Sequence, residues 1–123
     1  MNKLIVFAKH WTPGQVKTRL AASVGADAAA AIYREFIRCT TDRMAAVGNR
    51  RSVCVTPKER ANEFRQVASE ELWSISHQSA GDLGERMARA FSECLQSKGK
   101  VRAVIIGSDS PDLPAEWVVD AFE

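Results

Sequence analysis

The sequence has few cysteines, no long apolar run and no strong excess of charge of either sign. Its three cysteines, Cys39, Cys54 and Cys94, form no C-x-x-C pair, which argues against a zinc site or a disulfide framework. They are expected to be core thiols in a reducing cytoplasm. Lys9 and His10 interrupt the apolar N-terminal stretch well before the length of a signal peptide or membrane span. We therefore expect a cytoplasmic protein that does not associate with membranes.

The net charge is also low. A value of +2 is too small to indicate general binding to nucleic acid, so any basic feature of function must be local. The 123 residues fit one domain, and 46% hydrophobic with 26% charged residues is an ordinary globular balance. We therefore expect a single globular domain that does not bind nucleic acid.

Several common enzyme motifs are missing. The segment "PGQVKT" ends in Lys-Thr, as a P-loop does, but has Val16 where that loop needs glycine. No G-x-G-x-x-G follows an expected strand, and the sequence has no G-x-S-x-G elbow. His10 and His77 have no His or Glu partner at the spacing of metal ligands. A P-loop, a dinucleotide fingerprint, a hydrolase elbow and a histidine metal site are therefore not indicated.

Apolar strand-like runs alternate with helical segments along the whole chain. Strands are predicted at Lys3 to Ala8, Ser52 to Thr56, Leu72 to His77 and Val101 to Gly107. Helices are predicted at Gln15 to Val24, at Ala28 to Val47 with Asp27 as its cap, at Pro57 to Ser69, at Asp82 to Gln96 with a stop at Ser97-Lys98-Gly99, and from Pro114 to the last residue. This alternation predicts an α/β fold, a Rossmann-like three-layer α/β/α sandwich with a mainly parallel sheet.

The usual strand order for such a sheet is 3-2-1-4, which reverses direction between the first and fourth strands. Ligands bind at this switch point, outside the carboxyl ends of the strands. The loop after the first strand is basic, and the loop after the fourth strand, "GSDSPDLP", is acidic. The topology therefore predicts that a cationic loop lies beside an acidic one.

The cations of the first loop are Lys9, Lys17 and Arg19, arranged around Pro13-Gly14. Lysine offers a mobile point charge, and arginine offers a planar fork that holds phosphate through two hydrogen bonds. Gly14 allows a tight turn, so that backbone amides can also face an anion. The alternative is a solvated turn with surface cations. The position after the first strand favours an anion clamp.

The acidic loop holds Asp109 and Asp112 just past a buried strand. Carboxylates at this position can hold a hard divalent cation that neutralises a diphosphate. Asp112 has an alternative role as the cap of the last helix, with Pro114 in its first turn. Asp109 has no such local role, and its position at a strand end favours function.

The segment "QSAGDLGERM", from Gln78 to Met87, precedes and begins the fourth helix. Asp82 and Glu85 have the spacing of a capping box. Gly81 and Gly84 allow close approach of the backbone, either to a ligand or to the sheet. Gln78 is expected either to read a base edge or to be a solvated loop residue.

Four motifs together resemble the DUF2064 group of bacterial GT-A-like glycosyltransferase proteins, some of which are linked to arsenosugar biosynthesis. The matching segments occur in the right order from end to end of the chain: "FAK" at Phe7 to Lys9, "PGQVKTRL" at Pro13 to Leu20, "GDLGERM" at Gly81 to Met87 and "GSDSPDLP" at Gly107 to Pro114. The group is related to nucleotidyltransferases that act on phosphorylated acceptors.

The resemblance implies a nucleotide-diphospho-sugar transferase fold of GT-A type over residues 1–123. It implies a nucleotide site built from the first loop and the loop from Gln78 to Gly84. By the same analogy, Asp109 matches the metal-binding acid of the family and is the catalytic residue that holds Mg²⁺ or Mn²⁺, while Lys17 and Arg19 match the cations that contact the diphosphate.

The sequence departs from the group in two places. His10-Trp11 replaces the usual proline near the start of the first loop, and the chain ends before the Asp-Gly-Gly-Tyr segment of its relatives. We therefore expect the N-terminal, nucleotide-binding portion of a longer protein. The fourth strand is then left as a sheet edge that invites self-association.

The sequence leaves three functions open. The first is transfer of a sugar from a nucleotide diphosphate to a small acceptor. The second is nucleotidyl transfer from a nucleoside triphosphate to a phosphorylated acceptor. The third is nucleotide binding without turnover.

Overall fold

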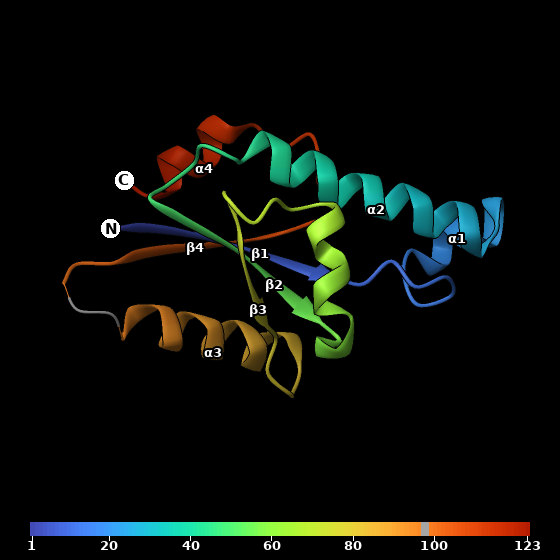
Figure 1. The fold of residues 1–123 in the computed structure, drawn as a ribbon, viewed down its shortest axis with the longest axis horizontal. Helices are drawn as coiled ribbons and strands as arrows, with labels where there is room; N and C mark the ends of the chain where they lie inside the picture. Colours follow the sequence, from blue (N-terminus) through green and yellow to red (C-terminus); the bar gives the residue numbers. More distant parts are fainter. Residues whose placement is uncertain (97–98) are drawn as a thin grey trace.

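The computed structural model describes residues 1–96 and 99–123, and its centre is a parallel sheet (Figure 1). The strands are β1 (Asn2–Lys9), β2 (Arg50–Thr56), β3 (Ser74–His77) and β4 (Arg102–Gly107). They pair in the order β3-β2-β1-β4, and every pairing is parallel. The predicted order, 3-2-1-4, is therefore confirmed. The predicted helix stop at Ser97 and Lys98 lies outside the described residues.

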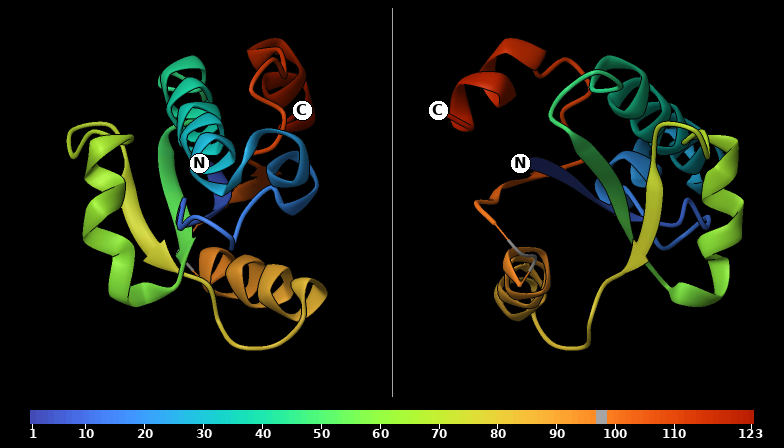
Figure 2. Two further views of the ribbon diagram at one scale, coloured as in Figure 1. Left: turned by 90° about the vertical axis from the view of Figure 1, so that its right-hand side faces the viewer. Right: turned by 60° about the vertical axis from the view of Figure 1, so that its left-hand side comes forward.

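Helices lie on both faces of the sheet. They are α1 (Thr18–Val24), α2 (Ala26–Arg43), the 3₁₀ helix η1 (Lys58–Gln66), α3 (Leu83–Leu95) and α4 (Ala115–Ala121). In Figures 1 and 2, α2 and α4 lie over one face and α3 lies under the other. This arrangement confirms the Rossmann-like α/β sandwich. Within the described ranges, no helix combines the length and the apolar character that crossing a bilayer requires.

The core is unequal on the two sides of the sheet. On the side of α2, η1 and α4, Leu4 and Val6 pack in a large cluster that includes Ile37 and Phe64. On the side of α3, the buried cluster contains Ile5, Phe7 and Cys54. β1 is therefore buried on both faces, which explains its continuous apolar run from Leu4 to Ala8.

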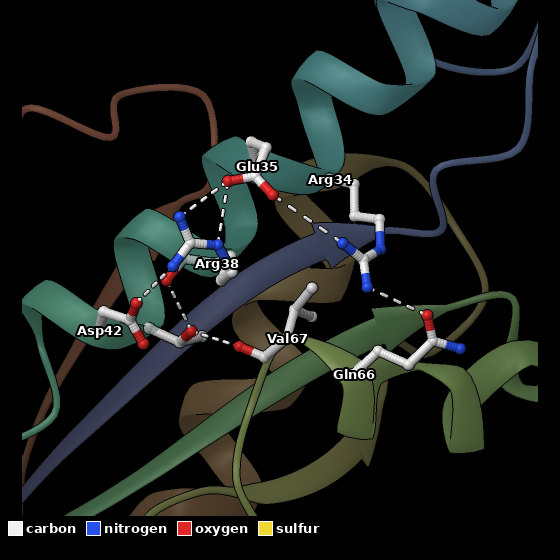
Figure 3. A network of polar contacts seen from close by, with 7 residues as sticks. Arg34, Glu35, Arg38, Asp42, Gln66 and Val67 are labelled. Atoms are coloured by element: carbon white, nitrogen blue, oxygen red, sulfur yellow. Dashed lines mark hydrogen bonds and ion pairs between the residues drawn. The ribbon is translucent and has the colours of Figure 1, made fainter.

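Polar contacts fix α2 against η1 and along its own surface (Figure 3). Arg38 pairs with Glu35 at 2.8 Å and with Asp42 at 2.9 Å, one turn apart on the exposed face. Arg34 donates to Gln66 of η1 at 3.1 Å. The hydroxyl of Thr41, buried between the elements, donates to the carbonyl of Val67 just after η1. The long helix is thus held to η1 and to the segment that follows it.

The first two helices begin at different residues than predicted. Helix α1 begins at Thr18 and not at Gln15, because Gln15 donates to the Thr12 carbonyl in a turn. Lys17 precedes the helix in the left-handed conformation, with φ 51° and ψ 47°. The predicted cap of α2 is wrong as well: Gly25 is the N-cap, and Asp27 lies in the first turn.

The remaining differences concern length and type. The predicted helix from Pro57 to Ser69 is a 3₁₀ helix from Lys58 to Gln66, which follows a cis Thr56–Pro57 peptide. Strand β3 begins at Ser74 and not at Leu72. Helix α2 ends at Arg43, and α4 ends at Ala121 and does not run to the last residue.

Candidate functional site

A cavity of about 580 Å³ opens at the carboxyl ends of β1 and β4. Its lining includes the three predicted cations, Lys9, Lys17 and Arg19, together with Asp109. Gln15, Val16, Thr18, Leu20, Tyr33 and Phe36 complete the lining. The structure therefore brings the cationic loop beside the acidic loop, as the topology predicts.

Lys17 and Asp109 form the direct contact between the two loops. The Nζ atom of Lys17 lies 2.9 Å from Oδ1 of Asp109. The Lys17 side chain is 25% exposed, and that of Asp109 is 72% exposed, so water screens the pair. The same ammonium lies 5.2 Å from the ring centroid of Phe36. Three cations thus face one carboxylate among the described lining residues, which leaves the cavity positively charged.

Tyr33 of α2 joins the two loops from beneath. Its hydroxyl accepts a hydrogen bond from the backbone N–H of Lys9 at 3.0 Å and bonds the hydroxyl of Ser108 at 2.8 Å. Tyr33 and Ser108 are both buried, and burial raises the pKa of the Tyr33 phenol above its ordinary value. The phenol therefore stays neutral and holds Lys9 and the residue before Asp109 at fixed positions.

Our sequence reasoning missed Tyr33 and Ser108. The available signal was that Tyr33, the only tyrosine of the chain, lies four residues before Ile37 on the apolar face of α2. A buried tyrosine hydroxyl needs a hydrogen-bond partner. Its partners come from segments far away in the sequence, so the spacing of residues could not identify them.

His10 and Trp11 anchor the first loop to η1. His10 is buried, and its ring nitrogens contact Thr12 Oγ1 at 2.7 Å and Glu63 Oε1 at 3.1 Å. The His10 ring stacks on Trp11 at 4.4 Å, and Trp11 meets the edge of Phe64 at 5.1 Å. This packing therefore fixes the loop.

Gln78 is tied to the sheet and is not a solvated loop residue. Its Nε2 atom donates to the carbonyls of Ala8 at 3.2 Å and Cys54 at 3.1 Å, and its Oε1 accepts from Arg86 at 3.2 Å. The side chain thus links the ends of β1 and β2 to α3. A contribution of Gln78 to nucleotide binding stays a prediction.

The capping box of α3 is confirmed. The Glu85 N–H donates to Asp82 Oδ1 at 2.8 Å, and the Asp82 N–H donates to Glu85 Oε1 at 3.4 Å. The Glu85 N–H also lowers the pKa of Asp82. Gly81 has φ 113°, a backbone conformation that residues with a Cβ rarely adopt, so glycine is favoured beside the box. Gln78, Gly81, Asp82 and Gly84 lie outside the described lining of the 580 Å³ cavity.

Comparison with known proteins places this geometry in a family. A model of the DUF2064 family, described as an uncharacterised protein conserved in bacteria, matches residues 39–123. The chain belongs to the DUF2064 family. The crystal structure of a proposed nucleotide-diphospho-sugar transferase from Desulfovibrio desulfuricans G20 matches this DUF2064 chain with a TM-score of 0.89 and 33% identity.

That match covers 98% of this chain and 52% of the Desulfovibrio chain, so the DUF2064 chain spans about half of that relative. No protein of curated function matches the sequence. The family and the fold predicted from the four motifs are therefore confirmed.

Gly14 and Asp112, the remaining predicted site residues of the DUF2064 chain, lie outside the described lining of the 580 Å³ cavity. Gly14 has φ 82° and turns the first loop before Gln15. Asp112 does not cap the last helix: the N-cap of α4 is Pro114, and no side-chain hydrogen bond caps this described helix. The interpretation of Asp112 as a cap is therefore wrong, because the helix begins too late for its carboxylate to reach the first N–H groups.

A divalent cation in this cavity would depend on Asp109. Within residues 1–96 and 99–123, no group of three or more His, Cys, Asp or Glu side chains could hold a metal ion. One exposed carboxylate nevertheless fits the coordination preference of Mg²⁺, which proteins commonly bind through one or two carboxylates together with substrate phosphates and water. The donor set is therefore compatible with a cation that arrives with a diphosphate.

Proposed function

We propose that this DUF2064 chain binds the diphosphate of a nucleotide-diphosphate sugar in the 580 Å³ cavity. One observation carries the proposal: Lys9, Lys17 and Arg19 line a single cavity at the switch point of the sheet, opposed by Asp109. A diphosphate is a small, concentrated anion, and such an anion is attracted to cations gathered in one hollow. The likeness to the Desulfovibrio protein supports a sugar nucleotide as the ligand.

The proposed reaction is transfer of the sugar to a small acceptor. The bond between the sugar and the diphosphate breaks, a bond to the acceptor forms, the acceptor proton is released, and a nucleoside diphosphate leaves. Negative charge develops on the leaving diphosphate. Lys17 and Arg19 would stabilise that charge, so catalysis would rest on positioning and electrostatics.

Asp109 is proposed to hold Mg²⁺ or Mn²⁺ together with the diphosphate. When bound, the cation would supply Lewis-acid stabilisation of the leaving group. In the free protein the Asp109 carboxylate pairs with Lys17 at 2.9 Å. Ligand binding would exchange partners: the phosphate would take Lys17, and the carboxylate would become available to the cation.

A thermal-shift screen of nucleotides and sugar nucleotides, with and without Mn²⁺, tests the proposal. Binding to the native state raises the melting temperature. We expect a rise with nucleoside diphosphates and sugar nucleotides that is larger with Mn²⁺ and smaller in Lys17→Ala. Lys58→Ala, at the start of η1, is the control. A rise that is equal for nucleosides and diphosphates, or unchanged in Lys17→Ala, would count against the site.

Product analysis separates the three functions. Release of nucleoside diphosphate from a sugar nucleotide supports sugar transfer. Release of pyrophosphate from a nucleoside triphosphate would show nucleotidyl transfer instead. Binding without any product would show a nucleotide-binding domain that does not turn over.

A further inference from the structure

A second cavity, of about 300 Å³, lies on the opposite side of the sheet, between its β2–β3 part and α3. Figure 2 shows α3 on this side, away from α2 and α4. None of the described residues that line this cavity also lines the 580 Å³ cavity. The two hollows are therefore separate sites, and the second plays no part in the proposed binding of a diphosphate.

The floor of the second cavity is polar. Ser52 pairs with Ser74 and Cys54 with Ser76 across β2 and β3, and all four residues line the cavity. Successive side chains of a strand point to opposite faces, so Val53 and Val55 point into the main core instead. A parallel sheet that is covered on both faces is usually apolar on both. This half of the α3 face is therefore suited to contact with a polar ligand or with water.

The walls of the second cavity carry a marked excess of positive charge. Among the described lining residues one acid, Glu93, accompanies four cations whose side chains belong to this face of the sheet or to α3: Lys3, Arg50, Arg86 and Arg89. This excess exceeds the net charge of +2 of the whole chain, so the cavity concentrates positive charge.

The charge of Arg86 is not neutralised by its partners. Arg86 donates to the Gly81 carbonyl at 2.8 Å and to the Gln78 amide, and both acceptors are neutral. Glu93 pairs with Arg89 at 2.9 Å. The side chain of Arg50 is without a hydrogen-bond or ion-pair partner in the described part of the chain.

We propose that this second cavity binds a phosphate group, as inorganic phosphate or as a small phosphomonoester. Guanidinium groups donate in a fork that matches phosphate oxygens, and serine hydroxyls donate further hydrogen bonds. The volume is at the lower end of the range for ligand pockets, which suits a phosphate with a small body. Arg50 and the serine floor would make the contacts, while Arg86 would supply fixed positive charge.

Two-dimensional NMR of the isotope-labelled chain tests this proposal. Titration with inorganic phosphate should cause saturable shifts of the amides of Ser52, Ser74 and Ser76. In Arg50→Gln the affinity should fall about tenfold, the effect of one lost charge-assisted contact. Arg43→Gln, on α2 and outside the described lining of both cavities, is the matched control and should leave the affinity unchanged. A parallel titration with glycerol 3-phosphate separates the two sources: tighter binding than inorganic phosphate identifies a monoester, and equal or weaker binding identifies the free ion.

The same NMR titrations distinguish phosphate binding in the second cavity from diphosphate binding in the 580 Å³ cavity. Lys17→Ala should leave phosphate shifts at the serine floor intact, and Arg50→Gln should leave nucleotide-induced shifts near Lys17 intact. If floor shifts are absent, or rise without saturation and equally in Arg50→Gln, the cavity is a water-filled gap and the proposal is wrong. Because Arg50 is exposed and makes no side-chain hydrogen bond in the described structure, its substitution should not unfold the chain.

Discussion

Lys17 contributes both a positive charge and an unusual backbone conformation to the 580 Å³ cavity. It pairs with Asp109, lies over Phe36 and directly precedes α1. Arg19 is one residue inside that helix and is exposed. The two cations are therefore expected to differ in strength as phosphate ligands.

Lys17→Ala should weaken binding of nucleoside diphosphates by about 1 kcal/mol, or roughly fivefold, because the ammonium is partly screened by water. Arg19→Ala should have a smaller effect, since its side chain is more exposed. Calorimetric titration measures both, and the nucleoside serves as the ligand control. Equal losses for nucleoside and diphosphate would mean that these residues support the fold of the loop and do not contact the anion.

Asp109→Asn should remove the metal-dependent part of nucleotide binding. The amide keeps the size of the side chain but loses the charge that attracts a divalent cation. Asp112→Asn is the matched control for the second candidate metal carboxylate of the same loop. Asp112 lies outside the described cavity lining, so metal dependence should not change, and it does not cap α4, so stability should not change. Titrations of nucleotide with and without Mn²⁺ give the comparison. Unchanged metal dependence in the Asp109 variant would exclude this residue from the site.

Tyr33→Phe should lower the free energy of unfolding by about 1–3 kcal/mol, the cost of leaving buried polar groups without a partner. The Lys9 N–H and the Ser108 hydroxyl both lose their bond to the phenol. Urea unfolding of Tyr33→Phe, Ser108→Ala and the double variant measures the coupling between the two side chains. Additive losses would mean that the bond between the two hydroxyls contributes nothing to stability.

At the scale of single elements, the capping box makes the start of α3 sensitive to acid. The pKa of Asp82 is lowered in the folded chain, so its carboxylate stabilises the fold fully above the pKa of the unfolded chain, about pH 4. This contribution is lost as the pH falls through the lower folded pKa.

We expect Asp82→Ala to lose stability relative to the native chain at about pH 6, and the difference to shrink at about pH 3. Asp82→Asn is the control, since asparagine caps a helix well without titrating. Urea unfolding at both pH values measures the change. A constant difference between Asp82→Ala and the native chain across this range would show that the carboxylate charge is irrelevant to the cap.

The sequence predicted the elements better than their boundaries. Apolar runs such as Leu4 to Ala8 identified the strands, and their alternation with helices gave the parallel order. The start of α1 was missed because residues 12–15 form a turn, closed by the Gln15 N–H on the Thr12 carbonyl, and Lys17 adopts a left-handed conformation that helix propensity does not predict. The segment after Pro57 has a helical composition but forms a 3₁₀ helix, which local propensity does not separate from an α-helix.

The candidate site was predictable in its cations and in Asp109, because topology alone brings the loops after β1 and β4 together. The roles of Tyr33, Ser108 and the serine floor formed by β2 and β3 were not predictable. The role of each depends on contact with a residue that is distant in the sequence. Tyr33, for example, bonds Ser108, 75 positions away.

At the scale of the whole molecule, two apolar features remain uncovered in the described structure. β4 forms one edge of the sheet, and Trp117 of α4 is 65% exposed. Val118 of α4 and Phe122, which follows the helix, are by contrast buried within the chain. Association through the edge of β4 stays a prediction.

We expect the chain to associate in a concentration-dependent way, and Trp117→Ser to weaken that association. Leu72→Ser, near β3 on the far side of the sheet and 44% exposed, is the matched control. Sedimentation velocity over a range of concentrations measures the association. A chain that sediments as a monomer at every concentration would remove the reason to expect contact through this side.

The backbone of Lys17 bears on how this chain could change over evolutionary time. A side chain at φ 51° costs free energy that glycine would not, so replacement by glycine would relieve the backbone at the start of α1. The same replacement would remove the ammonium that faces Asp109. Selection for thermal robustness alone would therefore erode the cavity at this position. Lysine at this position lowers the stability of the loop but supplies a charge for ligand binding. Variants that stabilise the loop are therefore expected to bind a diphosphate more weakly.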